Sequence, residues 1–133
     1  MEANDSVKAN LAITDAVGAR AMIHSDSALG AQRLNQEVAK AMYAGRAAGI
    51  NITEDQAIKW LTINPAWALG LDDKIGSIEV GKNADVVLWS GNPFSVYSRA
   101  EKVWIDGSMR YDRDDKAEKW RTDFELGLVK EDN

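Results

Sequence analysis

Cysteine is absent from this sequence of 133 residues, and its absence excludes a whole set of chemistries. Without a thiol, the chain has no disulfide framework, no thiolate metal site and no cysteine nucleophile. Histidine is almost absent as well, because His24 is the only one. A metal site built from this chain alone must therefore draw on carboxylates and on that single imidazole.

An excess of positive charge and long apolar runs are also lacking. The net charge of −5 argues against a nucleic-acid partner, which would need a basic face to neutralise phosphates. No stretch approaches the ~20 apolar residues that span a bilayer, and residues 1–10 contain no secretory segment. We therefore expect no membrane partner and a cytoplasmic location. The length suits one domain but is too short for a complete (β/α)8 barrel of about 250 residues.

The stretch Ala21–Ser27 carries the most informative polar residues. A short apolar run ends in His24 and Asp26 and gives way to small and polar residues. Buried parallel strands of α/β barrels end in this way, because their carboxyl ends carry active-site side chains. Side chains alternate along a strand, so His24 and Asp26 are predicted to lie on the same side and Ser25 on the other.

The same stretch admits a purely structural interpretation. Asp26 or Ser27 then caps the helix that follows, and His24 is a hydrogen-bonded core residue. The predicted order of helix, strand, loop and helix around it is typical of the last turn of an alternating α/β pattern. Both interpretations stay open on the local sequence alone.

Hydrophobic periodicity divides the rest of the chain into a helical half and a strand-rich half. Helices are predicted from Asp5 or Ser6 to 17, over 31–48, from a Thr53 cap to about 61, and after an Asn64 cap. Strands are predicted over residues 20–25, 75–81, 84–89, 101–105 and 108–111. Asp106-Gly107 is a strong turn signal between the last two, and an amphipathic helix is predicted over 112–128.

Several motifs of the second half resemble the C-terminal region of the amidohydrolase superfamily. They are Asn64-Pro65-Ala66, Ala68-Leu69-Gly70, the run from Gly76 to Lys82, Ala84-Asp85-Val86-Val87, and Val103-Trp104-Ile105-Asp106-Gly107. The likeness extends from about Ala16 to Tyr111. Within the superfamily, the chain is similar to metal-dependent hydrolases related to imidazolonepropionase and to amidohydrolase-type Xaa-Pro dipeptidases.

This resemblance implies an α/β fold in which a (β/α)8 barrel holds one or two divalent metals, usually zinc, beside a small β-sandwich. It implies that residues 1–70 are the last strand and helices of the barrel, with residues 20–26 as its final strand. Residues 71–112 are then strands of the composite β-sandwich, and residues 113–133 are a C-terminal helix and tail. Asp26 matches the family aspartate that binds metal and takes a proton from the metal-bound water.

The reaction implied by the resemblance is hydrolysis of a non-peptide or dipeptide C–N bond of a small-molecule substrate through metal-activated water. The other family ligands have no counterpart here: the His-x-His pair of the first strand, the bridging lysine or glutamate of the fourth, and the histidines of the fifth and sixth. His24 does not match a family ligand. It lies beside Asp26 as a contact to substrate or to the ligand shell, or it is an inner-layer barrel residue.

One aspartate and one histidine supply two ligands, whereas a catalytic zinc usually has three protein ligands and a water. We therefore expect the C-terminal portion of an amidohydrolase, incomplete as a barrel and inactive by itself, with little or no metal bound. Because a lone strand leaves backbone groups unpaired, we expect it to associate with an N-terminal barrel portion or with further copies of itself. Alternatives are a non-catalytic assembly module and a regulatory metal or anion binder using His24 and Asp26.

Overall fold

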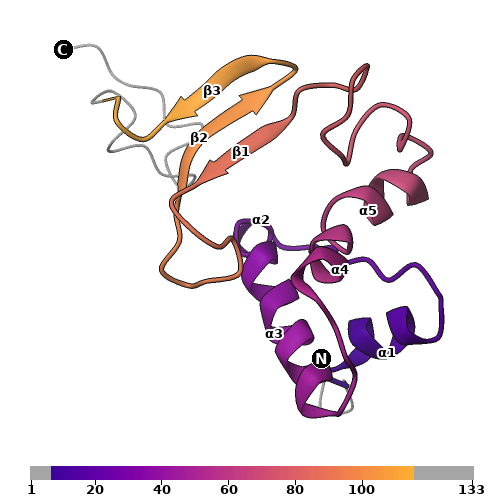
Figure 1. Cartoon of the computed structure of the whole chain (residues 1–133). Helices are drawn as coiled ribbons and strands as arrows, with labels where there is room; N and C mark the ends of the chain where they lie inside the picture. The colour runs from indigo at the N-terminus through magenta and orange to yellow at the C-terminus, as the bar shows by residue number, and fades with distance from the viewer. Residues whose placement is uncertain (1–6, 116–133) are drawn as a thin grey trace.

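The computed structural model of the chain describes residues 7–115, with residues 28 and 29 described by their backbone alone (Figure 1). Within this range, helical segments come first and a small open sheet follows, so the fold is mixed α/β. The helices are α1 (Asn10–Ala16), α2 (Ala28–Ala31), α3 (Leu34–Ala47), α4 (Glu54–Lys59) and α5 (Ile63–Ala68). None of the helices described is both long and apolar enough to cross a membrane.

The sheet contains three antiparallel strands in the order β1-β2-β3, namely β1 (Val86–Trp89), β2 (Ala100–Ile105) and β3 (Ser108–Asp112). The predicted hairpin turn between β2 and β3 is confirmed, because Asp106 and Gly107 take φ angles of 50° and 73°. Positive φ at both turn positions matches the twist of the flanking strands. The C-terminal helix predicted over 112–128 lies outside the described residues, except that Asp112 belongs to β3 and residues 113–115 are not helical.

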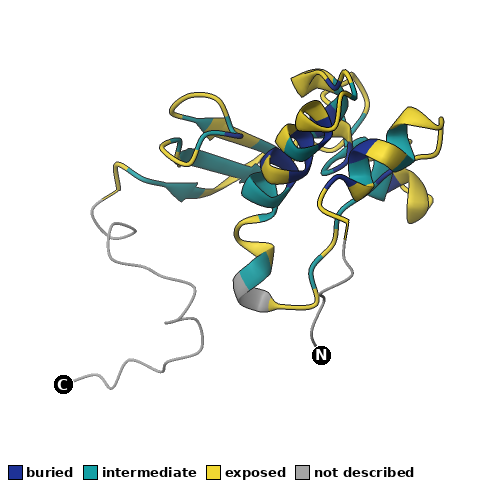
Figure 2. Cartoon of the chain, turned by 90° about the horizontal axis from the view of Figure 1, so that it is seen from below, coloured by how far each residue is buried: buried dark blue, intermediate teal, exposed yellow. Residues whose placement is uncertain are grey.

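The core lies between the helices, and Figure 2 shows most of the buried residues there rather than in the sheet. Its largest fully buried side chains are Val38 and Met42 of α3 and Trp60 after α4. Helices α1 and α3 pack at Gly45, where an added Cβ would overlap the side chain of Ala12. Glycine at this position therefore sets how closely the two helices approach.

The strand predicted over 20–25 is the main correction to the sequence analysis. Residues 19–25 run without helical structure and are not part of a described sheet. The amide of Ile23 donates to the carbonyl oxygen of Trp60, at 3.0 Å, instead of to a neighbouring strand. Local sequence predicted the apolar run correctly, but a strand also requires a partner, and the described part of the chain supplies none.

Four further predictions differ from the structure. The helix predicted over 31–48 is divided between α2 and α3. Arg33, with φ −120° and ψ 16°, is not helical and separates them. Residues 7–9 precede α1 instead of belonging to it. The 75–81 strand is wrong, because Gly76 and Gly81 take φ angles of 89° and 95° and turn the chain. Thr62, not Asn64, is the N-cap residue of α5.

Other local predictions are confirmed. Thr53 begins α4 through a reciprocal capping box, in which its hydroxyl accepts from the Gln56 amide and the Gln56 side chain accepts from the Thr53 amide. Gly49 follows α3 with a φ of 84°, as expected for a helix end. These signals involve residues three positions apart or fewer, so sequence alone contains them.

The segment between β1 and β2 connects the sheet to the helical core. Phe94 is buried among the core residues, and the Asn35 side chain of α3 donates to the Pro93 carbonyl oxygen at 2.6 Å. The Asn92 side chain donates to the carboxylate of Glu54 at 2.9 Å. This segment therefore fixes the start of the sheet against α3 and α4.

Candidate active site

Asp26 lies in a short turn between the extended segment 19–25 and α2. The Ser25 hydroxyl donates to the Ser27 carbonyl oxygen at 3.0 Å and accepts from the Ser27 amide at 3.1 Å. The Ser27 hydroxyl in turn caps α2 by accepting from the Gly30 amide at 3.2 Å. Ser27 is therefore the cap that the structural interpretation proposed, and the carboxylate of Asp26 takes no part in these bonds.

His24 and Asp26 lie close together, as expected for alternate residues of an extended segment. The His24 Nδ1 atom is 3.5 Å from the Asp26 Oδ1 atom, and the two side chains are 82% and 98% exposed. A separation of 3.5 Å is too long for a strong hydrogen bond, and exposed pairs of this kind contribute little to stability. The pair is therefore open to a ligand and is not held rigidly by its own interaction.

A cavity of about 580 Å³ adjoins His24 on the side of α1 and α3. Its lining includes the apolar residues Leu11, Met22 and Ala41 and the basic residues Lys8 and Lys40. Lys40 forms an ion pair with Glu37, another lining residue, which partly balances the positive charge. Asp26 does not line this cavity, so the cavity and the carboxylate are neighbouring features, both beside His24.

The described residues do not make a metal centre by themselves. No group of three or more histidine, aspartate or glutamate residues within them could hold an ion. Carboxylate and imidazole are suitable zinc ligands, but His24 and Asp26 supply one fewer than the usual three. A complete centre would need at least one further ligand from elsewhere.

The Gly76–Lys82 motif has a structural role that sequence reasoning did not predict. The Lys82 side chain is only 11% exposed, and its Nζ atom donates to the Asp72 carbonyl oxygen and to the Ser77 hydroxyl, both at 2.6 Å. Ser77 donates onward to Glu79 at 2.6 Å. The hydrogen bond from Ser77 and then the charge and hydrogen bond of Lys82 hold the pKa of Glu79 below its ordinary value.

Asp85, in the next motif, connects β1 to the hairpin. Its carboxylate accepts from the Asp106 amide at 2.8 Å, and the neighbouring Ala84 carbonyl oxygen accepts from the Gly107 amide at 3.1 Å. The Ala84-Asp85 and Asp106-Gly107 motifs therefore contact each other across the sheet. Their spacing in sequence gave no indication of this contact.

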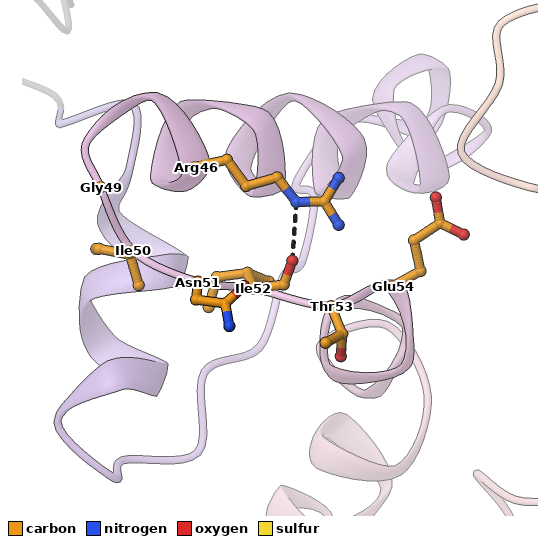
Figure 3. A pocket seen from close by; sticks show the side chains of 7 residues that line it. All are labelled: Arg46, Gly49, Ile50, Asn51, Ile52, Thr53 and Glu54. Atoms are coloured by element: carbon orange, nitrogen blue, oxygen red, sulfur yellow. Dashed lines mark hydrogen bonds between the residues drawn. The ribbon is translucent and has the colours of Figure 1, made fainter.

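A second cavity, of about 500 Å³, lies where the chain reverses between α3 and α4. Figure 3 shows the Arg46 side chain extending from α3 towards this reversal, where its Nε atom donates to the Ile52 carbonyl oxygen at 2.8 Å. Glu54 lies on the same wall and accepts from Asn92. These bonds fix the reversal, which accounts for both charged residues in structural terms.

Comparison with known proteins decides the family. The model of the amidohydrolase family matches residues 3–118. The chain belongs to the amidohydrolase family. The resemblance inferred from the motifs is therefore confirmed, and it covers most of the sequence.

Individual relatives agree with this assignment. The imidazolonepropionase of Bacillus cytotoxicus is 32% identical over 74 residues, which cover 51% of this chain and 18% of that protein. An amidohydrolase from Thermotoga maritima is 37% identical with a TM-score of 0.72, covering 83% of this chain and 27% of that one. An adenosine deaminase from Xanthomonas campestris, solved with bound zinc, shares the fold at 21% identity and a TM-score of 0.63, covering 80% and 31%.

The chain spans less than a third of the length of each of these proteins. Hydrolysis is therefore an activity of the whole members of the family, and its extension to this chain is a proposal. The family is generally metal-dependent, and the zinc-bound deaminase is an example among its structural neighbours.

Proposed function

We propose that this chain is the C-terminal portion of a metal-dependent amidohydrolase that hydrolyses a C–N bond of a cyclic amide, imine or dipeptide. The observation that carries the proposal is Asp26, an almost fully exposed carboxylate at the end of the extended segment 19–25. Ser25 and Ser27 shape the turn around it through their own hydrogen bonds. The carboxylate is thereby left available for chemistry.

In this proposal the Asp26 carboxylate would be one ligand of the metal centre and would accept a proton during hydrolysis. A bound zinc ion would supply a water of lowered pKa and a Lewis acid for the scissile bond. Because the described residues do not complete such a centre, the remaining ligands would come from a further part of the barrel. His24, 3.5 Å from Asp26, is proposed to contact the substrate or to orient that carboxylate.

The proposed division of the chain follows from this assignment. Residues 1–70 would supply the last strand and helices of the barrel, residues 71–112 the strands of the composite β-sandwich, and residues 113–133 a C-terminal helix and tail. Support comes from the Thermotoga amidohydrolase, which matches this chain over 83% of its length. The extended segment 19–25 would become the final barrel strand once neighbouring strands pair with it.

The decisive experiment is a hybrid of the Thermotoga amidohydrolase in which this chain replaces the matching segment. Metal content per chain is measured by elemental mass spectrometry, and hydrolysis is assayed on cyclic amides, imines and dipeptides. The intact Thermotoga protein sets the reference metal content, and circular dichroism confirms that the hybrids fold. We expect Asp26→Asn to lower hydrolysis at least about a hundredfold and to reduce the bound metal.

Asp73→Asn is the matched control, because Asp73 is an exposed aspartate with no hydrogen bond or ion pair to a described residue. This variant should behave like the unmodified hybrid. A folded hybrid that keeps its metal and its activity after Asp26→Asn would refute the role given to Asp26. A folded hybrid without metal would refute the proposal as a whole.

A second candidate function is a non-catalytic assembly module. Ile78 and Val80, within the family motif, are 86% and 108% exposed, and apolar side chains of this kind are often covered by another chain. The same hybrid separates the two functions, since an assembly module would restore a stable fold but neither metal binding nor hydrolysis.

A further inference from the structure

Asp106 and Gly107 form the exposed tip of the β2–β3 hairpin (Figure 1). Among residues 7–115, Asp106 is the one residue other than glycine with a positive φ, and Gly107 follows it with a positive φ as well. Asp106 is also the only aspartate of the sequence that glycine follows. Within the described residues, no hydrogen bond or ion pair engages its carboxylate, so the carboxylate is free to turn towards the backbone.

An aspartate that precedes glycine can react with its own backbone. The amide nitrogen of the glycine attacks the side-chain carboxyl carbon, so that a C–N bond forms, a C–O bond breaks and one water leaves, which gives a cyclic succinimide. Water then opens the ring. Cleavage at the side-chain carbonyl restores aspartate, and cleavage at the main-chain carbonyl gives isoaspartate of unchanged mass. Glycine favours the attack because it has no side chain to obstruct the nitrogen and its backbone rotates freely.

Two hydrogen bonds from the residues just before β1 hold the hairpin tip. The Asp106 amide donates to the Asp85 carboxylate at 2.8 Å, and the Gly107 amide donates to the Ala84 carbonyl oxygen at 3.1 Å. The nitrogen that would attack the Asp106 carboxyl carbon is therefore the donor of the second bond. To attack, it must give up its proton and rotate out of that bond. The contact with Ala84 and Asp85 thus opposes ring closure while it lasts.

We propose that Asp106 is a modification site at which isoaspartate forms, at a rate set by how often the hairpin tip separates from Ala84 and Asp85. Hydrogen-bonded contacts at a sheet margin open locally at a lower free energy than the whole fold. Isoaspartate adds a methylene group to the main chain, so the amides of residues 106 and 107 can no longer both reach their acceptors. The modification would therefore keep the hairpin tip detached from the residues that precede β1.

This modification does not rest on the proposed enzymatic role, and it is tested on the full chain. The protein is incubated at physiological temperature and pH and digested with trypsin, which releases residues 103–110 with Asp106 as their only aspartate. Liquid chromatography separates the isoaspartyl peptide, and electron-transfer fragmentation identifies it. The same chain unfolded in guanidinium chloride is the reference. We expect isoaspartate in both samples, forming at least about fivefold more slowly in the folded chain because the tip must open first.

Substitutions at Asp85 test what controls the rate, and they leave the peptide of residues 103–110 unchanged. Asp85→Ala removes the acceptor of the Asp106 amide, so it should speed isoaspartate formation in the folded chain about fivefold. Asp85→Asn keeps an acceptor oxygen at the same place, is the matched control, and should react at the wild-type rate. Asp106→Glu lengthens the side chain by one methylene and should abolish the signal. Circular dichroism confirms that each variant folds.

Hydrogen exchange of the wild-type Gly107 amide gives a measurement that needs no variant. Exchange and ring closure both require the bond to Ala84 to open, so protection of this amide should match the slowing of isoaspartate formation to within about tenfold. A larger mismatch would overturn the proposal. So would a folded wild-type chain that reacts as fast as the unfolded one or forms no isoaspartate at Asp106. Equal rates in Asp85→Ala and Asp85→Asn would overturn the part assigned to the Asp85 hydrogen bond.

Discussion

The Asn64 side chain of α5 donates a hydrogen bond of 2.7 Å to the carbonyl oxygen of Ala21, forty-three positions earlier in the chain. This bond ties the extended segment 19–25 to the start of α5. Asn64 lies within α5, whose N-cap residue is Thr62, and its side chain is directed to the extended segment. The Asn64-Pro65 motif thus positions the segment that leads to Asp26.

We expect Asn64→Ala to lower the free energy of unfolding by about 1 kcal/mol, because it leaves the carbonyl oxygen of the buried Ala21 without its partner. Urea denaturation monitored by tryptophan fluorescence measures this loss. Asn51→Ala is the control, since Asn51 is exposed and its side chain bonds to no described residue. Equal stability of the two variants would show that the bond contributes nothing.

Gly45→Ala should destabilise the protein by about 1–3 kcal/mol, although alanine is the better helix former. The reason is the overlap that a Cβ at this position would make with Ala12 of α1. Ala12→Gly in the same chain should recover part of the loss, because it removes the overlapping methyl group. A double-mutant cycle with thermal unfolding measures the coupling, and purely additive effects would contradict this account.

Replacing Ser77 with alanine should raise the pKa of Glu79 towards its ordinary value of 4.5, because the Ser77 hydrogen bond is the largest cause of its lowering. A lowered pKa in the folded state means that ionised Glu79 favours folding above pH 4.5. That contribution is lost as the pH falls through the folded-state pKa. An NMR titration of the Glu79 side chain checks the shift.

Lys82→Met should raise the same pKa, since the Lys82 charge is the next largest cause. It should also destabilise the motif, because the Asp72 carbonyl oxygen and the Ser77 hydroxyl lose their donor. Lys74→Met is the matched control, because the Lys74 side chain is exposed and makes no hydrogen bond to a described residue. A Glu79 titration unchanged in both Ser77→Ala and Lys82→Met would refute the arrangement.

The ion pair between Lys102 and Asp112, with Nζ and Oδ2 2.8 Å apart, should make the stability of the hairpin depend on pH. The Lys102 hydrogen bond lowers the pKa of Asp112 below its ordinary 3.8, and the Asp112 hydrogen bond raises the pKa of Lys102 above its ordinary 10.5. The pair therefore stabilises the fold most at pH values above the ordinary pKa of the aspartate, 3.8, and below that of the lysine, 10.5. Its contribution falls as acid protonates Asp112 or as alkali deprotonates Lys102.

Comparing wild type with Asp112→Asn by thermal unfolding tests this window. The difference in melting temperature should be largest near neutral pH and should shrink below about pH 4 and above about pH 10.5. A difference that stays constant from pH 2 to pH 11 would show that the charges of the pair do not matter.

Sequence predicted the parts of the fold whose causes are local. The Thr53–Gln56 capping box and the Asp106-Gly107 turn depend on neighbouring residues, and both were found where expected. The strand over 20–25 was wrong, because strand formation depends on a distant partner, and the strand over 75–81 was wrong, because Gly76 and Gly81 turn the chain. At the candidate site, the closeness of His24 and Asp26 follows from alternation along the chain, whereas the burial of Lys82 depends on Asp72, ten positions away. The catalytic role of Asp26 stays a prediction.

The burial of Phe94 has a consequence for the order of folding. The hairpin of β2 and β3 joins neighbouring residues and can form early, whereas β1 can join it only after the segment between β1 and β2 closes. Because Phe94 and Pro93 in that segment are held by the helical core, closure is easiest once α3 is in place. We therefore expect β1 to join the sheet last. Substitutions at Phe94 should then slow the completion of the sheet, although Phe94 lies outside its strands.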